Sequence, residues 1–232
     1  PAFHREPFRA WWEDRDGAAV SRAEADRRAL LLADPYTNYS HPYVGKAAVR
    51  VLEAAGVDVE VTDARPSGRP AYSMGFLDRA RTRAEATVDV LAPAVAEGRT
   101  PVFVEPSDAV VVQDDYEDLL DGPAVERVAA ETCGVMEYLD RERLDDHLGF
   151  RPVDEALAYH GHCNQKAVGT DHHAVGVLRR AGYRVDPVDS TCCGMAGSFG
   201  YEREHYDRSQ AIADILVDGI SDSDGDSVVA PG

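Results

Sequence analysis

The two halves of the chain align with each other when the first half is shifted by 126 residues. No gap is needed across residues 38–68 of the first half. The matched positions are glycine, asparagine and apolar pairs: Gly56 with Gly182, Gly68 with Gly194, Asn38 with Asn164, Leu52 with Leu178 and Ala55 with Ala181. A repeat of this kind predicts two copies of one structural unit, each of roughly 100 residues.

Short apolar runs alternate with amphipathic segments in both halves. The strand-like runs are residues 29–33, 57–61, 102–104, 156–159, 183–188 and 228–230. Helical periodicity is found in residues 45–55, 76–97, 123–139 and 201–217, and in a segment that ends at Gly182. This alternation is typical of parallel sheets with helices on their faces. We therefore predict an α/β fold made of two tandem strand–helix repeats with parallel sheets, related by internal duplication.

The pattern also predicts where the repeats begin and end. Residues 1–27 mix aromatic and charged side chains without a sustained period, and we interpret them as a linker from an upstream domain. Residues 28–121 then form the first repeat and residues 122–232 the second. Because the chain begins with Pro1 and stops within the second repeat, we expect it to be a piece of a longer protein.

The charge balance narrows the classes of partner. The chain has 24 basic and 42 acidic residues and a net charge of −18, which disfavours nucleic acids and anionic membrane surfaces as partners. The basic residues include only two lysines, Lys46 and Lys166. Acidic residues with arginine in place of lysine indicate a halophilic source, and a GC-rich genome with ordinary acidity is the alternative.

No apolar run approaches the ~20 residues of a membrane span, so we predict a cytoplasmic location, free or peripheral at the inner face of the membrane.

Three of the four cysteines lie where a parallel sheet binds ligands. Cys163 follows the strand-like run 156–159, and the pair Cys192 and Cys193 follows the run 183–188. Loops at the carboxyl ends of parallel strands meet at one edge of the sheet. Sulfur ligands from separate loops suit an iron–sulfur cluster or zinc. Cys133 lies inside the predicted helix 123–139 and is most simply a small buried residue.

Three further residues flank these thiols. Gly194 follows the cysteine pair and lets the backbone wrap closely around an ion or cluster. His160 and His162 precede Cys163, and each is either a hydrogen-bond partner of the ligands or a ligand in its own right. We therefore predict Cys163, Cys192 and Cys193 as metal ligands, with Gly194, His160 and His162 beside the cofactor. No pair of residues suggests a nucleophile and its base, so we predict no catalytic residue.

The segments 160–167 and 192–202, HGHCNQKA and CCGMAGSFGYE, resemble the cysteine-rich CCG domain. The resemblance covers nearly the whole chain from about Leu30, and it extends to the CCG pair of FAD-linked oxidases fused to iron–sulfur subunits. Relatives of that family include subunits of glycolate oxidase, anaerobic glycerol-3-phosphate dehydrogenase and heterodisulfide reductase. The resemblance implies an iron–sulfur cluster of the 4Fe-4S type in this chain. It also implies upstream FAD and ferredoxin-like domains as partners.

The first repeat departs from the CCG pattern. Pro66 and Ser67 stand where the family has its cysteine pair, Thr37 stands at the place of Cys163, and Asp108 stands where the family has a later cysteine. We therefore expect the first repeat to hold no thiolate-ligated cluster and Asp108 to be an exposed loop residue. The resemblance also implies that the second repeat takes a fourth ligand from beyond Gly232.

The resemblance implies an electron-transfer module of a flavin-dependent 2-hydroxy-acid dehydrogenase of the glycolate or D-lactate type. Electrons would pass from the flavin toward a quinone or another carrier, including a carrier at the membrane. Two alternatives from other classes stay open. One is a non-redox module that binds structural zinc, and the other is a thiol–disulfide module in which Cys163 cycles with Cys192 or Cys193.

Overall fold

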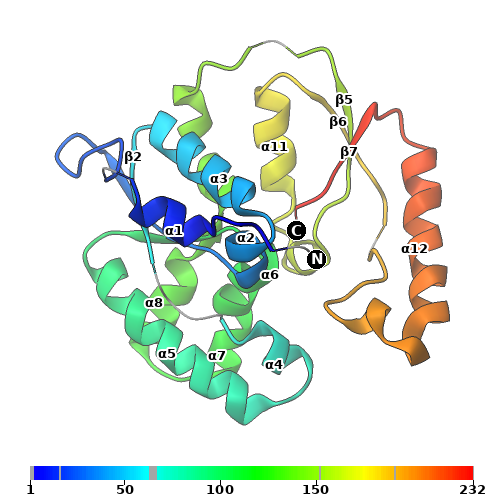
Figure 1. Ribbon diagram of the computed structural model, residues 1–232, viewed down its shortest axis with the longest axis horizontal. Coiled ribbons are helices and arrows are strands. Elements are labelled where there is room, and N and C mark those ends of the chain that lie inside the picture. The colour runs from blue at the N-terminus through cyan, green and yellow to red at the C-terminus, as the bar shows by residue number, and fades with distance from the viewer. Residues whose placement is uncertain (1–2, 16, 63–66, 152, 191, 232) are drawn as a thin grey trace. The chain divides into compact units, whose positions relative to one another are not determined.

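A computed structural model describes residues 3–15, 17–62, 67–151, 153–190 and 192–231. Figure 1 shows strands and helices alternating along the chain. The contacts divide the chain into two units, residues 1–148 and residues 149–232, which we call the first unit and the second unit. The prediction of an α/β fold with two parallel sheets is confirmed.

The first unit contains a four-stranded parallel sheet in the order β2-β1-β3-β4. Its strands are β1 (Arg27–Leu32), β2 (Val57–Val61), β3 (Thr100–Phe103) and β4 (Cys133–Gly134). The last four residues of β1 are buried. A continuous apolar run of this kind suits an inner strand of a parallel sheet, which is covered on both faces.

Helices surround this sheet, and α5 carries much of the core. Its buried residues Ala80, Ala84, Val88 and Leu91 recur at three- and four-residue intervals, which gives the helix one apolar face. The helices are α1 (Phe8–Glu13), α2 (Pro35–Tyr39), α3 (Pro42–Ala54), α4 (Arg69–Ser73), α5 (Leu77–Ala96), α6 (Pro106–Val110), α7 (Tyr116–Leu119), α8 (Pro123–Glu131) and α9 (Val135–Arg141), with the π-helical segment η1 (Val111–Asp115) and the 3-10 helix η2 (Leu144–His147).

The second unit contains a three-stranded parallel sheet in the order β6-β5-β7. Its strands are β5 (Ala156–Tyr159), β6 (Arg184–Pro187) and β7 (Ser227–Val229), and its helices are α10 (Cys163–Val168), α11 (His172–Arg180) and α12 (Tyr206–Ser221), with the turns η3 (Phe199–Tyr201) and η4 (Arg203–His205). Among the helices in the described part of the chain, none has the length and apolar character that a membrane span needs.

The elements of the two units follow one another in the same way. At the 126-residue shift, β2 falls on residues 183–187, where β6 lies, and β3 falls on residues 226–229, where β7 lies. The strand order β2-β1-β3 corresponds to β6-β5-β7. The matched glycines also share a backbone conformation, with φ of 83° and 104° at Gly56 and Gly182 and 94° and 87° at Gly68 and Gly194. These agreements support internal duplication, which stays a prediction.

The compact units differ in their bounds from the predicted repeats. The division falls after Leu148, and not at residue 122, because α8 packs on α5 and β4 pairs with β3. Residues 1–27, interpreted as a linker, also belong to the first unit. Phe8 of α1 is fully buried there, and Arg15 forms a salt bridge of 2.9 Å with the buried Glu53 of α3.

The prediction of one helix over residues 123–139 was wrong. The helix ends at Glu131, and Cys133 and Gly134 pair with Val102 and Phe103 before α9 begins. The pairing with β3 buries the segment between the two helices, so tertiary contacts override the local helical periodicity. Cys133 is 1% exposed, and the prediction that it is a small buried residue is confirmed.

Candidate functional site

Two loops of the second unit carry its three cysteines, and both leave the same edge of the sheet. Strand β5 leads into residues 160–162 and then α10, which begins at Cys163. Strand β6 leads into the loop that contains Cys192 and Cys193. Because β5 and β6 are parallel neighbours, their carboxyl ends lie together. The backbone N–H of His160 donates to the carbonyl of Val229 over 2.9 Å, so β7 also ends at this edge.

Cys163 lies at the start of a short helix that is capped by its own loop. The side chain of His162 accepts a hydrogen bond from the backbone N–H of Asn164 over 3.2 Å. The Cys163 side chain is partly buried, and burial is the largest cause that raises the pKa of its thiol. Cys192 and Cys193 raise this pKa further.

The loop around Cys192 and Cys193 is shaped by a glycine that no other residue can replace without strain. Gly194 has φ of +87°, and its N–H donates to the Cys192 sulfur over 3.3 Å. A Cβ at this position would lie 2.4 Å from the carbonyl oxygen of Ser209 in α12. The Ser209 hydroxyl in turn donates to the Gly194 carbonyl over 2.9 Å. The loop after the cysteine pair is therefore held against the start of α12.

We expect Gly194→Ala to destabilise the second unit by about 2–4 kcal/mol, because the new methyl meets backbone in addition to the left-handed strain. Gly197→Ala is the matched control: its φ is +69°, but a Cβ there meets nothing within 4 Å, so we expect a cost of about 1–2 kcal/mol. Amide hydrogen exchange of residues 153–231 measures the loss of stability in both variants. Equal protection factors in the two variants would contradict the role of the Ser209 contact.

His160 is a partner of the neighbouring loop. It is 8% exposed, and its Nδ1 lies 2.9 Å from the Ser190 hydroxyl. Burial, and then the positive charges of Lys166 and His162, lower the pKa of His160. This hydrogen bond joins the loop after β5 to the loop after β6, which fits the predicted role of a residue beside the ligands.

The thiols share one edge without forming a finished ligand set. Within the described residues, no group of three or more histidine, cysteine, aspartate or glutamate side chains is arranged to hold a metal ion. The chemistry of the donors still fits a thiolate-bound metal, because three cysteines on two neighbouring loops are the sulfur donors that such a metal takes. Gly232, near which the fourth ligand was predicted, lies outside the described residues.

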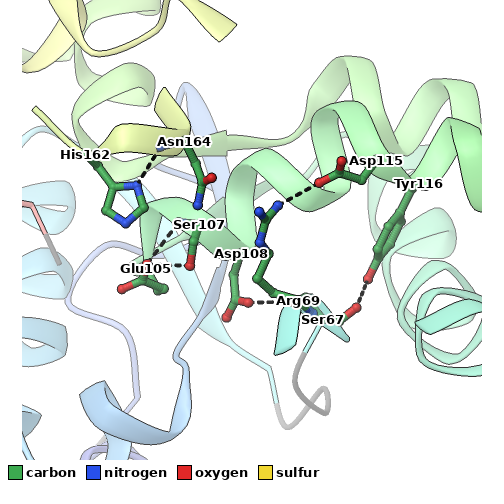
Figure 2. A network of polar contacts seen from close by, with 9 residues as sticks. All are labelled: Ser67, Arg69, Glu105, Ser107, Asp108, Asp115, Tyr116, His162 and Asn164. Carbon is green, nitrogen blue, oxygen red and sulfur yellow. Dashed lines mark hydrogen bonds and ion pairs between the residues drawn. The ribbon is translucent and has the colours of Figure 1, made fainter. Parts of the chain in front are cut away.

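The corresponding edge of the first unit is built from oxygens. Ser67 is 2% exposed, and its hydroxyl donates to a carboxylate oxygen of Asp108 (Figure 2). The Tyr116 hydroxyl donates to the Ser67 carbonyl over 2.6 Å, and Arg69 pairs with Asp115 over 2.7 Å (Figure 2). Thr37, at the place of Cys163, donates its hydroxyl to Asp34. Pro66 lies outside the described residues.

Asp108 was predicted to be an exposed loop residue, and this was wrong. It lies in the first turn of α6 and is 8% exposed. Burial raises its pKa to about 7, the nearby charges of Glu105 and Asp34 raise it as well, and the Ser67 hydrogen bond opposes the rise. The sequence signal that was available is the proline at the start of α6, since it places Asp108 in a helix that follows a buried strand.

Comparisons with known proteins agree with this picture of the second unit. Residues 157–232 match the family profile "CCG: Cysteine-rich domain". The chain is 28% identical over 235 residues to a subunit of the anaerobic glycerol-3-phosphate dehydrogenase of Escherichia coli (strain K12), covering 99% of this chain and 58% of that protein. It is 27% identical over 203 residues to the D-2-hydroxyglutarate dehydrogenase of the same strain, covering 85% of this chain and 19% of that protein.

The chain thus spans little more than half the length of the first of these relatives and about a fifth of the second. Among solved structures, an acetyl ester-xyloside bifunctional hydrolase from Caldicellulosiruptor lactoaceticus aligns with 94% of this chain and 97% of its own at 11% identity, with a TM-score of 0.28.

The second unit is therefore a cysteine-rich α/β domain with its thiols at the carboxyl edge of a parallel sheet. Most of this unit matches the CCG profile, and the resemblance predicted from the sequence is confirmed. Nearly the whole chain is similar to one part of an oxidoreductase subunit.

Proposed function

We propose that this chain is an electron-transfer module of a larger dehydrogenase, and that its second unit holds an iron–sulfur cluster. The observation that carries the proposal is the gathering of Cys163, Cys192 and Cys193 on two neighbouring loops of a CCG domain. Each thiol would lose its proton and ligate iron as a thiolate. When bound, such a cluster accepts and releases single electrons.

The chain's own residues would prepare this site. His160 and Ser190 join the two loops, His162 caps the helix that begins at Cys163, and Gly194 fixes the turn after the cysteine pair. The partly buried position of Cys163 favours its neutral thiol in the free protein. Metal binding must therefore displace a proton from this residue, so metal affinity should rise with pH.

We further propose that the parent protein oxidises a 2-hydroxy acid, of the glycolate or D-lactate type, at FAD in an upstream domain. The similarity to D-2-hydroxyglutarate dehydrogenases supports this class of substrate. The second unit would pass the electrons, received through an upstream ferredoxin-like domain, toward a quinone or another carrier. The 4Fe-4S type, a fourth ligand beyond Gly232 and a first repeat without a cluster are parts of the same proposal.

Anaerobic reconstitution of the chain, extended past Gly232 to include the proposed fourth ligand, with ferrous iron and sulfide tests the proposal. We expect iron and acid-labile sulfide in similar amounts, with visible charge-transfer absorption that bleaches on reduction and returns when a soluble quinone is added. Zinc alone in the purified chain would instead support the structural-zinc module. Free thiols that cycle with a disulfide and bind neither metal would support the thiol–disulfide module.

A further inference from the structure

Lys166 is unusual in this chain because the 24 basic residues include only two lysines. The other, Lys46, forms an ion pair with Glu6 and lies 5.3 Å from the ring centre of Trp11 in the first unit. Arginine and lysine can both form surface ion pairs of this kind. A lysine beside the cysteine loops, in a chain that otherwise uses arginine almost throughout, therefore indicates a position that needs the lysine side chain itself.

The Lys166 ammonium binds the loop that leads to the cysteine pair. It donates to the carbonyl oxygen of Val188 over 3.3 Å and to the carbonyl oxygen of Ser190. Lys166 itself lies in α10, three residues after Cys163. One side chain therefore joins the helix that begins with the first cysteine to the backbone two residues before Cys192.

Ser190 is held from two sides, by His160 in the loop after β5 and by Lys166 in α10. Its side chain lies 2.9 Å from His160 Nδ1, and its carbonyl accepts from Lys166. Ser190 is 5% exposed, so these polar contacts are shielded from water. Hydrogen bonds from a charged donor in such surroundings are stronger than those between neutral groups.

The space around Lys166 suits a narrow side chain. A Cβ placed on Gly161 would lie 2.9 Å from Lys166 Cε and 2.9 Å from a carboxylate oxygen of Asp171. The lysine stem therefore runs directly against the backbone of the loop after β5. A planar guanidinium is wider than an ammonium and would have to displace this loop to reach the same two carbonyl oxygens.

We propose that Lys166 is a positioning residue for the metal site, which holds the Cys192–Cys193 loop beside Cys163 so that their sulfurs can reach one metal. This inference rests on the proposed role of the three cysteines as ligands. The positive charge would also offset part of the negative charge that three thiolates bring to this edge of the sheet.

Titration of the full chain with Co²⁺ under anaerobic conditions tests this role, because sulfur-to-cobalt charge-transfer absorption reports the number of bound thiolates. We expect Lys166→Met to weaken Co²⁺ binding about tenfold or more and to lower the charge-transfer intensity per bound cobalt. Lys166→Arg should bind Co²⁺ more tightly than Lys166→Met and less tightly than the wild type. Arginine keeps the positive charge, but its guanidinium is too wide to reach the same two carbonyl oxygens without displacing the loop. Lys46→Met is the matched control and should bind as the wild type does.

Amide exchange of residues 188–193 in the metal-free chain gives a second measurement. Faster exchange there in Lys166→Met, with α11 unchanged, would support a local positioning role. If Lys166→Met fails to fold, Lys166→Arg and Lys166→Gln carry the same comparison. Wild-type Co²⁺ affinity and intensity in folded Lys166 variants would overturn the inference.

The two proposals can fail separately. A wild-type chain that binds Co²⁺ through thiolates but takes up no iron and sulfide would contradict the iron–sulfur function and leave the Lys166 comparison valid. A wild-type chain that binds no Co²⁺ through its thiolates would overturn the positioning role as well.

Discussion

Replacing Cys163 by serine is expected to reduce the iron bound after reconstitution to less than about a third of the wild-type amount, because a serine hydroxyl stays protonated where a thiolate binds iron. Cys163 begins α10, and Cys192 and Cys193 lie in the loop after the neighbouring strand β6. Iron and acid-labile sulfide per chain, measured after anaerobic reconstitution and desalting, check the prediction. Cys193→Ser should also lower both quantities.

Cys133→Ser is the matched control for these variants. Cys133 lies in β4 of the first unit, is buried, and has its sulfur 4.0 Å from the Pro101 carbonyl. The variant should bind as much iron as the wild type, while the free energy of unfolding falls by about 1–3 kcal/mol if the new hydroxyl finds no good partner. Loss of iron in Cys133→Ser, or its retention in Cys163→Ser, would overturn the assignment of ligands.

The stability of the first unit should fall as Asp108 ionises. Burial raises the pKa of this carboxyl from 3.8 to about 7 in the folded chain. Between these two pH values the unfolded chain has lost the proton and the folded chain keeps it, so raising the pH favours unfolding. The stabilisation by the neutral carboxyl is therefore complete below pH 4 and lost by about pH 7, and it amounts to on the order of 4 kcal/mol.

Asp108→Asn isolates this contribution, since the amide oxygen can still accept from Ser67 and the side chain no longer ionises. We expect the variant to gain stability relative to the wild type as the pH rises from 4 to 7, and to gain nothing more above that. Both tryptophans, Trp11 and Trp12, lie in the first unit, so urea unfolding followed by tryptophan fluorescence reports this unit. Asp89→Asn, on the exposed side of α5, should show no such difference. A constant difference between Asp108→Asn and wild type across this range would contradict the prediction.

The sheet-forming strands were predictable because their sequence signal is strong. Residues 57–61, predicted as a strand, coincide with β2, while residues 102–104 and 228–230 overlap β3 and β7 in part. Residues 57–61 alternate between apolar and acidic side chains, and the other two runs are apolar, so local pattern and tertiary environment agree. The long helix predicted over residues 76–97 is α5, Leu77–Ala96, and it continues through Pro93.

The features that sequence reasoning missed depend on contacts between distant residues. Strand β4 has two residues, too few for a period, and exists because it pairs with β3. The burial of Asp108 depends on Ser67, 41 residues earlier in the chain. The contact of Lys166 with the loop after β6 spans 22 to 24 residues. None of these partners follows from spacing in the sequence, whereas the positions of the three cysteines after β5 and β6 do.

The hydrogen bond between Ser67 and Asp108 also limits the mutational paths open to the first unit. Changing Ser67 alone to cysteine would replace a good donor by a weak one and leave a buried carboxyl poorly paired. Changing Asp108 alone to cysteine would leave the buried Ser67 hydroxyl with only a weak acceptor. Each single substitution by cysteine at this edge therefore lowers the stability of the first unit before a metal could bind and offset the loss. A sulfur site at this edge therefore requires Ser67 and Asp108 to change together.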